Sequence, residues 1–168
     1  MSVENLKNEE AISKLKKMID DIDIGILCSN VSGSEYIHAV PMSRQEVDDE
    51  GNIWFLISAT SQSHQNLLQN NKTSLLYSDV KNYAFLSLSG TAEISSDRNR
   101  IDKYWNKIIE AWFEGGKEDP NIRVLKVTPL EAHYWDNKAG KLVTFLKVAA
   151  SAISGAKMDI GREGDLAV

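Results

Sequence analysis

Near the start of the chain, apolar residues recur at steps of three and four positions, at Ile12, Leu15, Ile19 and Ile22. That spacing is typical of a helix that buries one face, and neither proline nor glycine interrupts it. Two glutamates precede most of the pattern and lysines 14, 16 and 17 follow them, an order of charges that the helix dipole favours. We therefore expect a helix here, with the lysines toward its end.

Beyond Asp23 the pattern changes to short runs of branched and aromatic residues, which are typical of β-strands. Pro41 favours an edge or an end of the strand in which it lies. The acidic stretch 46–52 predicts an exposed hairpin turn. The expected strands cover 24–28, 36–42, 53–57, 73–79, 82–94 and 122–135.

The strand expected over 82–94 alternates, and one face carries Ala84, Leu86, Leu88, Gly90, Ala92 and Ile94. The small residues at 90 and 92 predict that another group approaches the backbone closely there. The pattern leaves open which group that is.

Three more helices are predicted. A polar stretch from Ser58 to Asn66 leads into a short helix that Ser61 or Ser63 caps. A second helix is expected from 96–97 to the glycines at 115–116, and the segment 143–153 predicts a third. The apolar stripe of the second helix consists of Ile101, Trp105, Ile108 and Trp112.

Strands at hairpin spacing, with helices in the gaps, predict a mainly β fold, a small antiparallel barrel with flanking helices. No internal repeat or linker divides the 168 residues, so we expect a single domain over residues 1–168. A chain of this length buries roughly 70% of the surface of its unfolded form, which suffices for a core without disulfides.

Composition narrows the class of protein. The chain is 42% hydrophobic and 26% charged with three prolines, which is typical of a globular domain. Its formal net charge of −5 argues against a dedicated nucleic-acid binder, which needs a basic face. Because the sequence has neither a signal-peptide pattern nor an apolar run of about 20 residues, we expect a cytoplasmic protein without a membrane partner.

No catalytic motif stands out. The chain lacks a nucleophile elbow, a phosphate loop and a dinucleotide-binding glycine pattern. Its histidines, at 38, 64 and 133, are far apart, so no metal site is predicted. The single cysteine, Cys28, lies in an apolar strand and is interpreted as a buried hydrophobic residue. The catalytic residues are unknown at this point.

The segment 58–65 and the aromatic residues carry the more informative signals. Hydroxyl side chains cluster where a strand ends and a helix begins, and a helix start offers free amides to a phosphate. Serine capping alone explains the same pattern. Trp105, Trp112, Phe113, Tyr134 and Trp135 provide flat surfaces for a ring system, or pack in the core or in an interface. A flat, phosphate-bearing ligand is therefore permitted but not required.

Six short motifs occur in an order that resembles one known family. They are His38-Ala39-Val40-Pro41-Met42, Trp54-Phe55-Leu56-Ile57-Ser58, Ser61-Gln62-Ser63-His64, Leu88-Ser89-Gly90-Thr91-Ala92, Trp112-Phe113-Glu114-Gly115-Gly116 with Asp119-Pro120, and Tyr134-Trp135-Asp136. In this order they resemble the general stress protein branch of the pyridoxamine 5'-phosphate oxidase-like family. The resemblance covers nearly the whole chain.

The resemblance implies a six-stranded antiparallel split β-barrel and a homodimer with FMN, or alternatively FAD, at the subunit interface. It also implies which residues contact the flavin. These are His38, Val40, Leu56, Ile57, Ser58, Ser63 and His64, followed by the weaker candidates Gly90, Trp112, Phe113 and Trp135.

Two positions depart from the family pattern, which often has arginine at position 40 and lysine at position 64. His38, Arg44 and Lys72 are the candidates to replace that charge. The resemblance favours a flavin-dependent oxidoreductase of unknown substrate. The alternatives are a flavin-binding or flavin-buffering protein without turnover, and a dimeric barrel that has lost its flavin. Oxidation of pyridoxamine phosphate is disfavoured, because Arg162 is the only arginine near the C-terminus.

Overall fold

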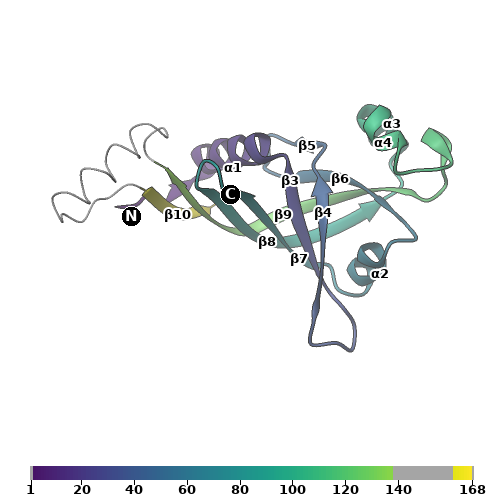
Figure 1. Cartoon of the computed structure of the whole chain (residues 1–168), viewed down its shortest axis with the longest axis horizontal. Coiled ribbons are helices and arrows are strands. Elements are labelled where there is room, and N and C mark those ends of the chain that lie inside the picture. Colours follow the sequence, from purple (N-terminus) through teal and green to yellow (C-terminus); the bar gives the residue numbers. More distant parts are fainter. Residues whose placement is uncertain (1, 138–160, 168) are drawn as a thin grey trace.

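The computed structural model describes residues 2–137 and 161–167, as an open β-sheet with helices packed around it (Figure 1). The predicted helix over 143–153 lies outside these residues. The helices are α1 (Asn8–Ile22), α2 (Gln62–Gln69), α3 (Arg98–Tyr104), α4 (Lys107–Glu110) and the short 3-10 helix η1 (Gly116–Glu118). The strands are β1 (Ser2–Val3), β2 (Leu6–Lys7), β3 (Ile24–Asn30), β4 (Ile37–Ser43), β5 (Glu46–Val47), β6 (Ile53–Ser58), β7 (Lys72–Asp79), β8 (Ala84–Ser95), β9 (Ile122–Asn137) and β10 (Gly161–Ala167).

Six strands form one antiparallel path, in the order β4, β3, β7, β8, β9 and β6. Within the described residues the two end strands of this path, β4 and β6, do not pair with each other, so the sheet stays open. Its longest strand, β9, pairs with β6 at its start and with β10 at its end. This arrangement confirms the predicted mainly β, split-barrel fold and the six predicted strands.

Helix α1 closes the inner face of the sheet. Ala11, Leu15, Met18 and Ile19 are buried against residues of the central strands, such as Leu27. The prediction that lysines end this helix is wrong, because α1 runs to Ile22 and its last turn holds no basic residue. Aspartates lie there instead, and Arg44, which follows β4, places Nη2 2.9 Å from the Asp20 carboxylate. A tertiary contact thus supplies the cation that the helix lacks.

The second predicted helix is broken in two. The side chain of Asn106 accepts hydrogen bonds from the amides of Ile108 and Ile109, so that α4 starts anew after α3. Asparagine competes for backbone amides in this way and caps helices well. After this restart α4 buries Ile109 and leaves Ile108 exposed, and in the turn that follows α4 Phe113 is buried and Trp112 is exposed. Half of the predicted apolar stripe is therefore wrong.

A small second core holds α3 and α4 against the outer face of β6 and β9. Ile101, Ile109 and Phe113 pack there against Ile122 and Val124.

No helix in the described part of the chain is both long enough and apolar enough to cross a membrane.

Candidate functional site

The start of α2 is built by its own serines. Ser61, one of the two predicted candidates, caps the helix, because its Oγ accepts a hydrogen bond from the His64 amide at 3.2 Å and donates one to the Ser58 carbonyl at 2.7 Å. The amides of Gln62 and Ser63 have no acceptor in the described part of the chain. These two donors, at the positive end of the helix dipole, are suited to an anion.

Helix α2 is fixed on the inner face of the sheet by a buried hydrogen bond. Asn66 donates from Nδ2 to Ser29 Oγ at 3.1 Å, and both side chains are buried. Ser29 belongs to a row of paired residues that crosses four strands, from His38 on β4 through Ser29 and Thr73 to Gly90 on β8. The helix is therefore fixed to a strand row that includes two of the predicted site residues, His38 on the neighbouring strand β4 and Gly90 two strands away on β8.

His64 is the most unusual residue of this helix. Its side chain is only 8% exposed, and its Nδ1 atom is buried without a hydrogen-bond partner among the described residues. Burial lowers the pKa of His64, and the nearby charge of Arg123 lowers that pKa further. His64 is consequently neutral at pH 7, and a buried polar atom without a partner is suited to a ligand.

Arg123, at the start of β9, was not predicted as a site residue. It pairs with Ile57 of β6, and the two side chains lie on the same face of the sheet. Next to this pair, the Asn121 carbonyl accepts a hydrogen bond from the Ala59 amide, which ties the loop before α2 to β9. Arg123 Nη1 donates to the carbonyls of Pro120 (2.7 Å) and Ile122 (2.9 Å). Within the described residues no carboxylate pairs with this guanidinium.

The structure brings most of the predicted residues to α2. Val40 lies on the same face of β4 as His38, two residues along, and Ser58 ends the strand that leads to the helix. Seven predicted residues lie on α2, at the end of β6 before it, on β4, or on the strand row that Ser29 shares, namely His38, Val40, Ile57, Ser58, Ser63, His64 and Gly90.

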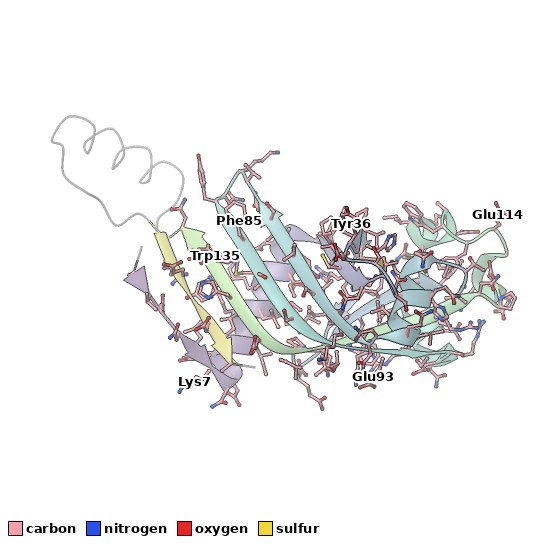
Figure 2. The ribbon with its side chains drawn as sticks, turned by 90° about the horizontal axis from the view of Figure 1, so that it is seen from below. Lys7, Tyr36, Phe85, Glu93, Glu114 and Trp135 are labelled. Carbon is pink, nitrogen blue, oxygen red and sulfur yellow. The ribbon has the colours of Figure 1, made fainter. Side chains whose placement is uncertain are left out.

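The other four predicted residues lie elsewhere in the subunit. Leu56 and Phe113 belong to the second core, on the opposite face of β6 from Ile57, and the neighbouring Trp112 is 79% exposed. Figure 2 shows Trp135 at one end of the sheet and Glu114, which follows Phe113, at the other. Trp135 packs its ring 4.5 Å from that of His133 and pairs with β10.

The structure explains why position 90 is a glycine. A Cβ atom at this position lies 2.2 Å from the carbonyl oxygen of Thr128 on β9, next to an irregularity in the pairing of β8 with β9. The close approach predicted from residues 90 and 92 therefore exists, and the approaching group includes the backbone of the neighbouring strand.

The remaining candidates for chemistry are held by other contacts. Cys28 is buried, as predicted, and burial raises its pKa. A cleft of about 1050 Å³ lies beside α1, away from α2, and the charged groups Lys14, Asp136 and Arg162 on its wall pair with one another. No cluster of metal-ligating side chains occurs among the residues that the structure describes.

A family model for proteins described as "pyridoxamine 5'-phosphate oxidase like" matches residues 10–159, which is most of the chain. The chain belongs to the pyridoxamine 5'-phosphate oxidase-like family. Within this family it falls among the general stress proteins, as the sequence resemblance predicted.

Solved structures of this family agree with the fold. General stress protein 26 from Jannaschia sp. CCS1 is 27% identical, with a TM-score of 0.70, and the alignment covers 95% of this chain and 96% of that one. The general stress FMN/FAD binding protein from Xanthomonas citri is 30% identical, with a TM-score of 0.66, over 79% of this chain and 93% of that one.

Two curated relatives match over shorter segments. Protein bli-3 of Neurospora crassa is 35% identical over 77 residues, which is 41% of this chain and 37% of bli-3. General stress protein 26 of Bacillus subtilis is 37% identical over 46 residues, which is 27% of this chain and 32% of that protein. The chain thus aligns with about a third of the length of these relatives.

Proposed function

We propose that this chain binds a flavin, FMN or alternatively FAD, with a phosphate of the flavin at the start of α2. The observation that carries the proposal is the open first turn of this helix, where two amides have no acceptor and the buried Nδ1 of His64 has no partner. A phosphate group provides acceptors for such donors. The general stress FMN/FAD binding protein from Xanthomonas citri, 30% identical, adds support from a relative.

The residues around the helix start fit the polar end of a flavin. The hydroxyls of Ser58 and Thr60 lie 2.9 Å apart beside the capping Ser61, and each has lone pairs or a proton to offer to a second partner. On the sheet side, the half-buried Val40 offers an apolar surface without competing charge, backed by the core residue Ile57. The site therefore combines donors for a phosphate with an apolar wall.

The proposal includes a homodimer. In a single subunit Trp135 lies twelve residues along β9 from Arg123, roughly 40 Å for an extended strand, so it would reach a flavin at α2 from a second copy. Figure 2 shows Trp135 at the opposite end of the sheet from Glu114. The outer face also carries an exposed apolar row across three strands, Pro41, Ile26 and Leu76, which are paired in register. An apolar patch of this kind is typical of an interface.

A bound flavin would supply the redox chemistry, and the proposed activity is that of a flavin-dependent oxidoreductase. The role of the chain is to bind and orient the cofactor, and no side chain is assigned to catalysis. Pyridoxamine phosphate is a poor substrate candidate, because Arg162 already pairs with Asp136 (2.5 Å) and Glu4 (3.1 Å). A second phosphate would have to break these ion pairs.

The first test is an absorption spectrum of the purified protein after incubation with FMN and gel filtration. We expect a band near the flavin maximum at about 450 nm that elutes with a dimer. Bleaching of this band by NADH or NADPH supports an oxidoreductase, whereas a stable band supports a flavin carrier without turnover. Protein that elutes without the band at micromolar FMN contradicts the proposal and favours a barrel without flavin.

A further inference from the structure

A flavin phosphate carries negative charge, and the residues that form the start of α2 provide no positive charge to balance it. Val40 is apolar, the serines are uncharged, and His64 is neutral because burial and Arg123 lower its pKa. Hydrogen bonds to a phosphate are about twice as strong when the donor is charged. A cation beside this helix start is therefore the feature on which phosphate affinity depends most.

Two of the cations that the sequence suggested are directed elsewhere. Arg44 lies at the far end of β4, six residues from His38 and so roughly 20 Å along the strand. There it pairs with Asp20 at 2.9 Å. Lys72 follows the C-terminus of α2, and this helix of eight residues separates it from Ser61 by about 12 Å.

Arg123 is placed differently. It lies on the same face as its partner Ile57, at the end of β6 that leads to the helix, and the Ala59–Asn121 hydrogen bond holds this loop against β9 at 2.8 Å. Its charge reaches His64 strongly enough to lower the pKa of that side chain. Nη1 donates only to the backbone carbonyls of Pro120 and Ile122, so the positive charge is not neutralised by a carboxylate of the described residues.

We propose that Arg123 supplies the positive charge that holds the flavin phosphate at the start of α2, acting together with the amides of Gln62 and Ser63. This inference rests on the proposed flavin binding. The carbonyls of Pro120 and Ile122 hold the guanidinium through Nη1, which leaves Nε and Nη2 for the ligand. The selectivity of the chain for FMN over riboflavin, which lacks the phosphate, then comes from this residue.

The test compares FMN with riboflavin by titration of the apoprotein, followed through quenching of flavin fluorescence. Wild-type protein should bind FMN more tightly than riboflavin, and added salt or inorganic phosphate should weaken FMN binding only. Arg123→Gln should weaken FMN binding by about 10- to 100-fold and leave riboflavin binding unchanged. Arg123→Lys, which keeps the charge, should recover part of the loss.

Arg98→Gln is the matched control, because this exposed arginine pairs with Glu118 on the α3 side of the molecule. It should leave both affinities unchanged. An equal loss of FMN and riboflavin binding in Arg123→Gln contradicts the inference and assigns a structural role to the residue. If Arg123→Gln does not fold, the wild-type protein alone decides. The inference is overturned if its preference for FMN over riboflavin does not change with added salt or inorganic phosphate. Wild-type protein that binds neither flavin overturns the proposed function itself.

Discussion

The hydrogen bond between Asn66 and Ser29 should be a main support for the position of α2. Both side chains are almost fully buried, at 3% and 1% exposure, and the Nδ2–Oγ distance is 3.1 Å. Gln62 donates in turn to Asn66 Oδ1 at 2.9 Å. Replacing either member of the pair by alanine leaves the other polar group buried without its partner, which costs about 1–3 kcal/mol.

We expect Asn66→Ala and Ser29→Ala each to lower the free energy of unfolding by about 2 kcal/mol. In the double variant the second substitution removes a group that has already lost its partner. The loss in the free energy of unfolding of the double variant should therefore be smaller than the sum of the two single losses, by about 1 kcal/mol. Urea denaturation of the apoproteins, followed by tryptophan fluorescence and far-UV circular dichroism, measures all four free energies.

Gln65→Ala provides a matched control on the same helix, because this amide is exposed and reaches only the Ala59 carbonyl. Its effect should stay below about 0.5 kcal/mol. If the loss of stability in the double variant equals the sum of the losses in Asn66→Ala and Ser29→Ala, the reasoning is refuted, because the two side chains are then not bonded in solution. An Asn66→Ala variant as stable as the control would show that α2 is held by other contacts.

Three further predictions concern stability. Gly90→Ala should lower the free energy of unfolding by about 2 kcal/mol or more, because the added methyl group meets the Thr128 carbonyl at 2.2 Å; an unchanged urea midpoint contradicts this. Tyr77→Phe should be neutral or stabilise by up to about 1 kcal/mol, since the buried Tyr77 hydroxyl has no partner among the described residues; a clear loss in the same assay shows that the hydroxyl is bonded. Because the pKa of His64 is lowered in the folded state, below about pH 6.5 the unfolded chain binds a proton at this residue more readily than the folded chain does. The contribution of His64 to the free energy of unfolding is therefore complete above that pH and is lost as the pH falls further. In urea titrations from pH 7 to 5, His64→Gln should lose stability less steeply than the wild type, and an identical slope argues against the lowered pKa.

The fold was predictable where the signal is local. Alternation along 82–94 predicted strand β8, because a half-buried strand repeats every two residues whatever its partners are. The break between α3 and α4 was missed for a local reason as well. Asn106 offers its side chain to two backbone amides, and an apolar period of three and four residues does not reveal that competition.

The candidate site was predictable only in part. The sequence predicted a serine cap at Ser61 or Ser63, because serine side chains accept hydrogen bonds from the first free amides of a helix, and the structure places the cap at Ser61. Arg123 has no such signal, because it occupies an ordinary alternating position of β9. Only the register that pairs it with Ile57 brings its charge to α2, and that register is a long-range property of the sheet.

The most direct test of the central claim is a crystal structure of the chain with FMN bound. We predict that the phosphate lies at the first turn of α2, within hydrogen-bond distance of the Gln62 and Ser63 amides and of the Arg123 guanidinium. FMN bound with its phosphate away from this helix would contradict the account, whatever its affinity.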